Sequence, residues 1–551
     1  MNLKRTTYLI LSVLLTISLL ACSKKNSSSS QSSQAVMDNG REIIGNTYSS
    51  GLPIVKNPET FKVAIYRHTQ DRSKSYAEKL AFIKAQTETG VNIEWIELVA
   101  GTEIEKTNIM LASDLPDAFI HLVNEEMLAK NTGSFINLDK DGLLRKYAPN
   151  VVKQYEAEIP NVWDTLRFPD GAIYSLMTGV QTNYEQDGEG IQIINKAWVE
   201  KVGKKLPTTL EEYFDVMKAI RDGDPNGNGL KDEIPVEFTQ ENWAATILNF
   251  AGPWGIAADR ASVSEQQFFY FRVKNGKVEP TINTKAFRDF LEFYHRMAEE
   301  KLIDVEGFSQ TNQQYFAKCR EYVVGSHMAW TFDGFIPDKA GEFVVLPPIS
   351  APGYQYAKTG QLDRLRGNRT GFAITTACKN PAALLRWWDY LSGTTEIKYL
   401  TRYGEEGNLW ERDSSGKVWT IFPENESADF NREIKKYTWG AFNYEPLVMK
   451  SEMEQNDPIK YPKAVARSLM VDQVKNYLLT EVVPMRFVSP EKISERSFIE
   501  TELISYMNGF IARSILNGLT EAGWQAHLKQ LDSLNFPAWI RWYQDLVDNK
   551  L

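Results

Sequence analysis

Residues 61–66, FKVAIY, form an apolar run of strand length and open an alternation of strand and helix patterns. A helical pattern follows and ends at Gly90, a residue typical of helix C-caps. Residues 91–95, VNIEW, alternate apolar and polar side chains as a second strand would. Residues 107–111 predict a short helix, and residues 118–123, AFIHLV, a third strand. Strands and helices that alternate at this spacing favour βαβ units and a mainly parallel sheet, so the fold class is α/β.

The same kinds of signal continue toward the C-terminus. Residues 191–195, IQIIN, predict another strand, and Thr208 with Glu211 three residues later predicts a capped helix start. Asn380 followed by Pro381 opens a further helix. The last hundred residues are expected to be mostly helical, with the clearest helix over residues 498–515 and Ser497 as its N-cap.

The N-terminus reads as a targeting segment. Lys4 and Arg5 precede an uncharged stretch over residues 8–20 that is too short for an ordinary membrane span. The stretch ends in Leu-Ala-Cys at Cys22, which resembles the bacterial lipobox. The resemblance implies cleavage before Cys22 and acylation of this residue; an ordinary secretory signal with a chance cysteine is the alternative. The polar residues that follow, rich in serine, predict a solvated tether.

Length, composition and charge limit the class of protein. The chain has 551 residues, 43% hydrophobic and 24% charged, which is globular and long enough for at least two domains. A formal net charge of −9 argues against nucleic acid as a partner. Beyond Cys22 the only cysteines are Cys319 and Cys378, which leaves one disulfide open but gives no zinc-type spacing. No second apolar stretch of membrane length follows residue 22, which predicts a soluble body.

Residues 224–233, DPNGNGLKDE, carry the sharpest motif of the chain. Oxygen-bearing side chains recur at short intervals while Gly227 and Gly229 let the backbone curl, as in a calcium loop. The twelfth EF-hand position would be Pro235, so Glu233 is expected to supply the bidentate carboxylate instead. The predicted structural Ca²⁺ ligands are Asp224, Asn226, Asn228, the Leu230 carbonyl, Asp232 and Glu233. A Gly/Asn turn without an ion remains the alternative.

Aromatic residues in irregular stretches give a second signal. Trp243, Trp254, Trp330 and Trp439 lie in segments rich in glycine or proline. Indole rings stack on the C–H faces of sugars, so concave sites built this way suit carbohydrate, although each tryptophan could equally belong to the core. His68 and His121 each stand near or beyond the end of a predicted strand, where α/β clefts bind ligands, but surface or satisfied loop histidines are the favoured alternative.

Several segments resemble a known family in the right order along the chain. They are LASDLPD at 111–117, DGAIY at 170–174, NKAW at 195–198, PTT at 207–209, the 224–235 loop, the strand ending in Trp330, and GEEGN at 404–408. Together they resemble the extracellular solute-binding proteins of family 1, in the large lipoprotein subgroup of ABC importers that includes alginate- and oligosaccharide-binding lipoproteins. Two departures are the missing glycine between Ser113 and Asp114 and Met177 in place of a usual proline.

The resemblance implies a two-lobed periplasmic-binding-protein type II fold, also described as a Venus flytrap, with a hinge and extra helices. The expected division is a signal peptide over 1–21, a lipidated cysteine and tether over 22–57, an N-terminal lobe over 58–180 and 332–395, and a C-terminal lobe over 181–331 and 396–551. The C-terminal lobe would carry the calcium loop. The chain would cross between the lobes near residues 176–182, near Phe332 and near residues 391–400.

The same resemblance implies a function in transport rather than catalysis. The chain would be a monomer that captures an oligosaccharide outside the cell, lipid-anchored at the extracellular face of the bacterial cytoplasmic membrane. It would deliver the sugar to two permease subunits with a separate ATPase. Trp243, Trp330 and Trp439 are the expected stacking residues, and Asp333 and Arg67 the expected hydroxyl binders. A peptide-binding transport lipoprotein, a surface glycoside hydrolase, and a lipid-anchored sensor or chaperone are the alternatives.

Overall fold

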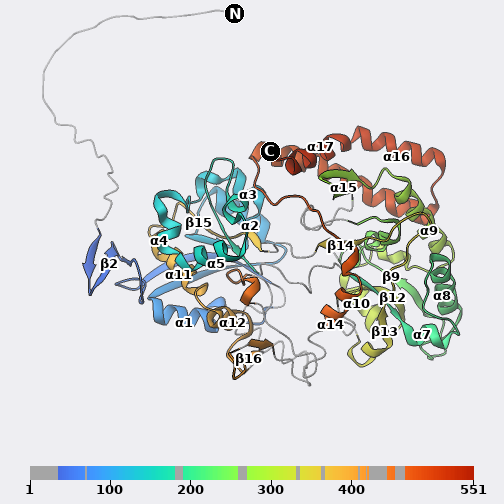
Figure 1. Cartoon of the computed structure of the whole chain (residues 1–551), viewed down its shortest axis with the longest axis horizontal. Coiled ribbons are helices and arrows are strands. Elements are labelled where there is room, and N and C mark those ends of the chain that lie inside the picture. The colour runs from blue at the N-terminus through green and yellow to red at the C-terminus, as the bar shows by residue number, and fades with distance from the viewer. Residues whose placement is uncertain are drawn as a thin grey trace, which may run out of the picture.

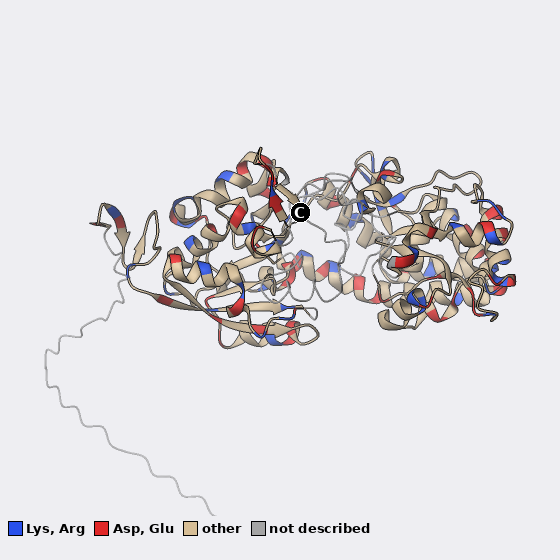
Figure 2. Cartoon of the chain, turned by 90° about the horizontal axis from the view of Figure 1, so that it is seen from below, with Lys and Arg blue, Asp and Glu red and all other residues tan. Residues whose placement is uncertain are grey.

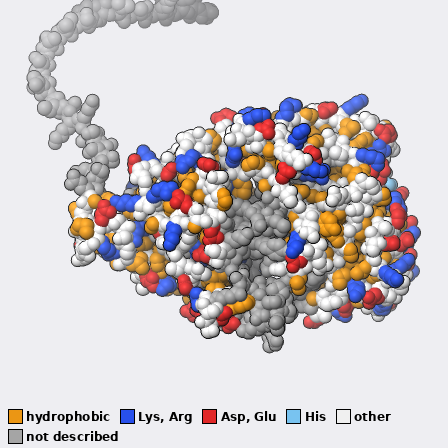
Figure 3. Space-filling model, in the orientation of Figure 1, with side chains coloured by type: hydrophobic (Ala, Val, Ile, Leu, Met, Phe, Trp, Pro, Cys, Tyr) orange, Lys and Arg blue, Asp and Glu red, His pale blue; other side chains and the backbone are white. Residues whose placement is uncertain are grey.

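We analysed a computed structural model of the chain, in which two α/β bodies lie side by side along the longest axis (Figure 1). It describes residues 35–68, 71–179, 190–242, 244–257, 270–330, 336–361, 367–407, 410–416, 418–420, 438, 444–452 and 466–551. Each body is built around its own mixed sheet. Lys and Arg residues alternate with Asp and Glu along the ribbons of both bodies (Figure 2), and their side chains are interspersed over the face drawn in Figure 3. The predicted α/β, two-lobed architecture is confirmed.

The first lobe contains a five-stranded sheet in the order β5-β4-β6-β15-β7. The strands are β4 (Glu59–Arg67), β5 (Val91–Val99), β6 (Ala118–Ile120), β7 (Leu176–Thr178) and β15 (Asn368–Ile374). Strand β4 pairs in parallel with β5 and β6, as the sequence predicts, whereas β15 is antiparallel to β6 and β7. The chain enters β15 from the other lobe, at the edge where β4 and β6 end, so β15 must run back against them. The expectation of a mainly parallel sheet is therefore only partly correct.

The second lobe contains a four-stranded sheet in the order β13-β8-β12-β9. The strands are β8 (Ile191–Asn195), β9 (Ile234–Glu237), β12 (Val324–Ala329) and β13 (Phe343–Val345). Strands β12 and β9 are parallel, and β8 is antiparallel to both β12 and β13. Strand β8 matches the predicted residues 191–195.

Helices cover both sheets. They are α1 (Leu80–Thr89), α2 (Glu103–Ala112), α3 (Glu125–Lys130), α4 (Leu143–Tyr147), α5 (Pro149–Glu158), α6 (Val162–Leu166), α7 (Lys196–Lys201), α8 (Leu210–Asp222), α9 (Lys285–Glu299), α10 (Asn312–Arg320), α11 (Pro381–Leu391), α12 (Thr395–Tyr403), α14 (Ala466–Asp472), α15 (Pro490–Asn517), α16 (Glu521–Ser533) and α17 (Phe536–Val547). The smaller strands are β1 (Val36–Asp38), β2 (Arg41–Ile44), β3 (Thr47–Tyr48), β10 (Phe271–Lys274), β11 (Lys277–Pro280), β14 (Lys358–Gln361), β16 (Trp410–Arg412), β17 (Val418–Thr420) and β18 (Leu478–Leu479).

Two helix starts differ from prediction. The side chain of Thr209, not Thr208, caps α8, and the Glu212 carboxylate accepts hydrogen bonds from the backbone N–H and the hydroxyl of Thr208. Helix α15 begins eight residues before the expected start, because Ser489 caps it and Pro490 occupies its first position. Ser497 therefore lies inside α15.

Strand pairing moves two of the expected lobe boundaries. Residues 343–345 pair with β8 and β14 pairs with β18, so residues 336–361 belong to the second lobe rather than the first. Helix α12 and residues 444–452 belong to the first lobe, where Lys398 forms an ion pair with Glu452. Consequently the described residues on both sides of Phe332 lie in the second lobe, and residues 391–400 lie in the first. Among the described residues, the chain changes lobes between 179 and 190, between 361 and 367, and between 452 and 466.

The N-terminal strands β1, β2 and β3 form a small sheet beside the first lobe (Figure 1). Arg386 of α11 donates to the carbonyl oxygens of Tyr48 and Gly51, and Thr47 donates to the Asn380 side chain. These bonds fix the start of the described chain to the first lobe. Cys319 in α10 and Cys378 after β15 are both buried and free, so the disulfide left open by the sequence is absent. Within the described ranges, no helix is long and apolar enough to span a bilayer.

Candidate functional site

The carboxyl ends of β4, β6 and β7 form one edge of the first sheet, and those of β9 and β12 form one edge of the second. The chain leaves the first edge at Thr178 and enters β8 at Ile191, so these two edges are the ones that the crossing joins. A Cβ at Gly190 would lie 1.9 Å from the carbonyl oxygen of Ala244, so only glycine fits where the chain enters the second lobe. Open α/β sheets bind ligands at carboxyl edges of this kind.

Three rings gather at the first edge. The centroids of His121 and Tyr444 lie 4.5 Å apart, and Tyr66 contacts Tyr444 edge to face at 5.5 Å. Tyr66 and His121 are half-buried at the ends of β4 and β6, whereas Tyr444 is buried. Tyr444 therefore supports the other two rings from behind, and these two are the part of the cluster within reach of a ligand.

His121 is held in one orientation. The backbone of His121 has a left-handed φ of 54°, and β6 ends at the residue before it. The His121 backbone N–H donates to the Gly371 carbonyl. The Asn368 amide nitrogen lies 3.0 Å from Nδ1, while the Asn368 oxygen accepts from the Thr370 N–H. Since the amide nitrogen can only donate, Nδ1 accepts and Nε2 carries the proton. Burial lowers the pKa of His121 to about 4, so the ring is neutral at physiological pH.

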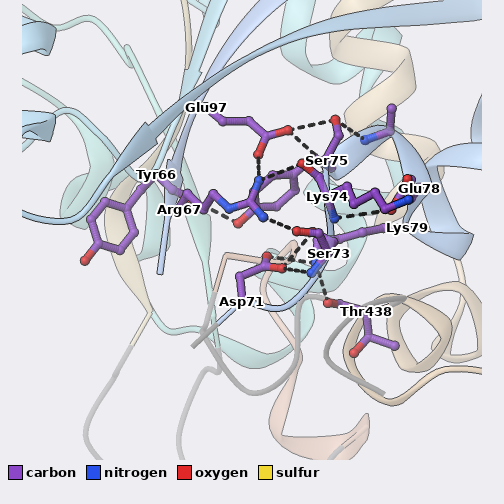
Figure 4. A network of polar contacts seen from close by, with 12 residues as sticks. Tyr66, Arg67, Asp71, Ser73, Lys74, Ser75, Glu78, Lys79, Glu97 and Thr438 are labelled. Atoms are coloured by element: carbon purple, nitrogen blue, oxygen red, sulfur yellow. Dashed lines mark hydrogen bonds and ion pairs between the residues drawn. The ribbon is translucent and has the colours of Figure 1, made fainter. Parts of the chain in front are cut away.

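The structure assigns Arg67 a different role from the one expected. Its guanidinium forms an ion pair with Glu97 and donates to the carbonyl oxygens of Ser73 and Lys74 (Figure 4). These contacts bind the loop after β4 back onto β5. Three acceptors occupy the group, so its predicted contact with sugar hydroxyls has little support here.

Lys79 and Asp71 add a buried ion pair to the same loop. The ammonium of Lys79 lies 2.8 Å from the Asp71 carboxylate and donates to the carbonyl of Thr438 (Figure 4). Asp71 also accepts from the N–H and hydroxyl of Ser73. The loop that follows β4 is thus tied to a segment more than 350 residues later in the chain.

On the second edge, Trp330 directly follows β12 and is half-buried. The guanidinium of Arg467 lies 4.0 Å from its ring centroid and donates to its carbonyl oxygen. Trp330 is therefore held at the carboxyl edge, and its role in stacking stays a prediction. Trp254 belongs to the core, where it packs against Phe290. Trp243, Trp439 and Asp333 lie outside the described residues.

Sequence reasoning missed Tyr66, Tyr444 and Asn368. Tyr66 had a usable signal, because it precedes Arg67 on a strand and must point to the opposite face, as it does in Figure 4. Tyr444 and Asn368 had none, since only the return of the chain to the first lobe brings them beside His121.

The 224–233 loop follows α8 in the second lobe. The Asp224 carboxylate accepts from the backbone N–H groups of Gly227, Asn228 and Gly229, with distances of 2.8 to 3.1 Å. The amide nitrogens of Asn226 and Asn228 donate to the Asp232 carboxylate at 3.1 and 2.9 Å. Gly227 and Gly229 both have φ of 78°, which curls the loop so that the oxygen-bearing side chains converge.

The surroundings of the Glu233 carboxylate indicate whether a cation fits this loop. Both of its carboxylate oxygens are buried without a hydrogen-bond partner among the described residues. Burial, followed by the nearby charges of Asp232 and Asp224, raises its pKa. Two orphaned oxygens beside other carboxylates fit a hard cation, because the cation would satisfy all of them. In the described part of the chain, no group of three His, Cys, Asp or Glu side chains could hold a metal. A cation in this loop would therefore also need the asparagine oxygens and a backbone carbonyl as ligands.

The two mixed sheets and the chain crossings between them give a two-lobed α/β fold of the kind that solute-binding proteins have. No family model matches the chain. The chain is similar to the fructooligosaccharide ABC transporter substrate-binding protein FusA of Streptococcus pneumoniae serotype 4 (strain ATCC BAA-334 / TIGR4), with 26% identity over 494 residues. The aligned residues cover 86% of this chain and 87% of FusA. This similarity confirms the resemblance to ABC-importer solute-binding proteins that the motifs indicated.

Solved structures agree in fold. The structure of FusA from S. pneumoniae in complex with kestose matches with a TM-score of 0.75 at 24% identity, covering 89% of this chain and 99% of that chain. A solute-binding protein from Bifidobacterium longum infantis, described as binding HMO, matches with a TM-score of 0.76 at 19% identity, covering 90% and 99%. A second FusA structure is described as an EF-hand mutant in complex with fructo-nystose.

Proposed function

We propose that this chain is the substrate-binding component of an ABC importer and captures an oligosaccharide between its two lobes. The observation that carries the proposal is the half-buried pair Tyr66 and His121 at the carboxyl edge of the first sheet. Ring faces beside fixed amide and imidazole N–H groups suit a sugar, which presents apolar C–H faces and hydroxyls together. The similarity to FusA, which is named for fructooligosaccharide, extends over 86% of this chain and supports the same ligand class.

Capture would proceed by closure of the lobes. A ligand shifts this equilibrium only through contacts that it gains in the closed state, here to the first edge and to the region of Trp330 at once. The closed form would deliver its sugar to two membrane-spanning permease subunits served by a separate ATPase. The sequence itself carries no Walker-type phosphate loop.

A structural Ca²⁺ in the 224–233 loop belongs to the same proposal. Asp224, Asn226, Asn228, Leu230, Asp232 and Glu233 would hold it, with Glu233 as the bidentate ligand. The orphaned oxygens of Glu233 support this assignment, as does the mention of an EF-hand in the FusA structure. The ion would neutralise three clustered carboxylates and stiffen the connection between α8 and β9.

We further propose that Cys22 carries a lipid and holds the protein at the extracellular face of the cytoplasmic membrane. The polar residues 23–34 would act as a tether, and the docking of β3 on α11 would place the first lobe at the end of that tether. The molecule would act as a monomer and would not change its ligand chemically.

A calorimetric titration of the mature chain tests the proposal. The panel should hold neutral and acidic oligosaccharides, short peptides and amino acids, all with Ca²⁺ present. Binding of an oligosaccharide series, with the sugar recovered intact, supports the proposal. Binding of peptides but no sugar would establish the peptide alternative, and recovery of shortened sugars would establish a hydrolase.

A further inference from the structure

A small cavity of about 20 Å³ lies at the carboxyl edge of the second sheet. Ile191 and Gln192, the first two residues of β8, both line it. Because neighbouring side chains on a strand point to opposite faces of the sheet, a cavity that touches both must lie beyond the end of β8. Strand β8 runs antiparallel to β12, so this end of β8 is at the carboxyl edge of β12.

The cavity adjoins Trp330 at the same edge. Ala329, the last residue of β12, pairs with Ile191, and Trp330 directly follows Ala329. Arg467, whose guanidinium lies over the Trp330 ring, belongs to α14, and Val474 shortly after this helix lines the cavity. A ligand that reaches Trp330 is therefore also close to the cavity.

Two tyrosines bring their hydroxyls to the cavity from the helices on one face of the sheet. Tyr213 of α8 and Tyr294 of α9 both line it. The Tyr213 hydroxyl accepts a hydrogen bond from the Gln192 amide at 2.8 Å. Tyr294 is only 3% exposed, yet its hydroxyl has no hydrogen-bond partner among the described residues. Burial raises the pKa of Tyr294, and the nearby Tyr213 and Tyr356 raise it further, so this hydroxyl keeps its proton.

Tyr356, just before β14, adds a third phenol to the lining. Gly252, in a 3-10 helix over Ile247–Trp254, allows its close approach: a Cβ there would lie 2.6 Å from the Ala357 carbonyl oxygen and 3.0 Å from Cε2 of Tyr356. The Tyr356 ring also meets the Tyr477 ring edge to face at 5.2 Å. These contacts fix the ring, and within the described part of the chain its hydroxyl, like that of Tyr294, has no hydrogen-bond partner.

Size and lining together define what fits. Roughly 10–15 Å³ of such space holds one water, so the cavity admits one or two non-hydrogen atoms but no sugar ring. A charged group would enter without a counter-ion, because every described lining residue is uncharged. A hydroxyl can accept from the phenol groups, and a carbon atom beside it suits the apolar walls. These walls comprise Ile191, Leu210, Phe250, Pro253, Leu346, Pro347, Ile349 and Val474.

We propose that this cavity receives the exocyclic hydroxymethyl group of a hexose unit, with the hydroxyls of Tyr294 and Tyr356 bonding its oxygen. The inference rests on the proposed function and narrows its substrate class to oligosaccharides that contain hexoses. A pentopyranose has no such group, so its binding would leave the two phenol hydroxyls unsatisfied, and sites built to bond a hydroxyl discriminate against ligands that lack it.

Ligands that differ only in the hydroxymethyl group test the inference. Cello- and xylo-oligosaccharides share their linkage and ring hydroxyls, but only the former carry this group. The mature chain with Ca²⁺ is titrated with both, and with fructo- and galacto-oligosaccharides. We expect a hexose series to bind at least about tenfold more tightly than the xylo-oligosaccharides. Xylo-oligosaccharides that bind as tightly as the best hexose series overturn the inference and leave the proposed function standing. Binding of no oligosaccharide overturns both.

A variant locates the interaction. Tyr294→Phe removes only the hydroxyl, and Tyr354→Phe is the matched control, since the Tyr354 hydroxyl donates to Asp289 and Tyr354 does not line the cavity. We expect Y294F to lose about fivefold to tenfold in affinity for the best hexose ligand, and Y354F to bind it as the unmodified protein does. Neither variant should change the affinity for the analogue of that ligand in which the hydroxymethyl is a methyl group.

Two results for Y294F would contradict the assignment. Unchanged affinity for the hexose ligand would mean that the cavity holds only water, and an equal loss for the ligand and its methyl analogue would mean that Tyr294 acts through the fold alone. Should Y294F fail to fold by circular dichroism, the comparison of cello- and xylo-oligosaccharides on the unmodified protein still decides the inference.

Discussion

The ammonium nitrogen of Lys79 lies 2.8 Å from a carboxylate oxygen of Asp71, and both side chains are buried almost completely. Burial lowers the pKa of Lys79, while the charge of Asp71 works against that shift. Lys79 also donates to the carbonyl of Thr438. The pair thus joins the loop after β4, at the candidate site, to a distant segment of the first lobe.

Lys79→Met should destabilise the protein by about 3–5 kcal/mol, because it leaves the buried Asp71 carboxylate without its cationic partner. The double variant with Asp71→Asn should recover much of this loss. Lys84→Met serves as the control, since the exposed pair of Lys84 and Glu88 should be worth less than about 1 kcal/mol. Urea unfolding followed by circular dichroism measures all three. An equal loss for K79M and K84M would contradict a structural role for the buried pair.

The raised pKa of Glu237 predicts that the stability of the folded protein depends on pH. Burial, followed by the neighbouring Asp304, raises the pKa of this carboxyl from 4.5 to about 9. Above about pH 4.5 the unfolded chain releases this proton while the folded chain keeps it. The stability that the protonated group contributes is therefore lost as pH rises from about 4.5 to 9.

Glu237→Gln should flatten that dependence, because an amide keeps the acceptor for Gln310 and cannot ionise. We expect the variant to gain on the unmodified protein progressively between pH 5 and 9, by about 1 kcal/mol or more at the upper end. Glu306→Gln is the control, because Glu306 is an exposed carboxylate that pairs with Lys318, the partner of Asp304. Melting temperatures across this pH range provide the measurement, and parallel curves for E237Q and the unmodified protein would rule the explanation out.

Calcium should raise the melting temperature, and a chelator should lower it. A ligand at a hundredfold excess over its Kd adds about 2.7 kcal/mol to the folded state when the unfolded chain does not bind it. Glu233→Gln should remove most of this effect, because Glu233 has the two orphaned oxygens. Asp222→Asn is the control: Asp222 precedes the loop, is exposed and pairs with Arg221. A calcium-dependent shift of unchanged size in E233Q would remove Glu233 from the ligand set.

Lipidation should depend on Cys22 alone. Cys22→Ala should release the protein from the membrane fraction and abolish incorporation of labelled fatty acid, because Cys22 is the cysteine that directly follows the apolar leader. Cys378→Ala is the matched control, as Cys378 is buried after β15. Retention of C22A in the membrane after a high-salt wash would mean that the leader itself is the anchor.

Much of the local structure was predictable from the sequence, because short-range chemistry decides it. Strand β8 matches the apolar run 191–195, and Asn380 caps α11 as its place before Pro381 suggests. Where two local signals competed, the sequence misled. Ser497 resembled a helix cap, but α15 already begins at Ser489, where Pro490 fixes the first turn.

The lobe boundaries and the candidate site were harder to predict, because they depend on long-range pairing. Nothing near Phe332 reveals that β13 returns to the second sheet beside β8. Arg67 carries the charge expected of a ligand-binding residue, yet its guanidinium forms an ion pair with Glu97, thirty residues later in the chain. The turn of the 224–233 loop is the exception, since the residues that shape it lie within ten residues and need no distant partner, while its Ca²⁺ stays a prediction.

The two lobes also contact each other through a pair of rings. Phe168, between α6 and β7, stacks on Phe487, between β18 and α15, with centroids 4.0 Å apart and planes at 18°. The guanidinium of Arg369 lies 4.3 Å from the same Phe487 ring, and both phenylalanines are buried. Because this contact joins elements of different lobes, its loss should affect their relative motion as well as stability.

Phe487→Ala should therefore widen the distribution of lobe arrangements and lower the free energy of unfolding by about 3 kcal/mol, through the lost burial and the cavity left behind. Small-angle scattering with and without ligand measures the first effect, and urea unfolding measures the second. Phe498→Ala is the matched control, since Phe498 lies on α15 but is 69% exposed. If F487A scatters as the unmodified protein does in both states, the stack stabilises the chain without restraining its lobes. A larger radius of gyration in the free state alone would instead show that the stack limits opening while the ligand still drives closure.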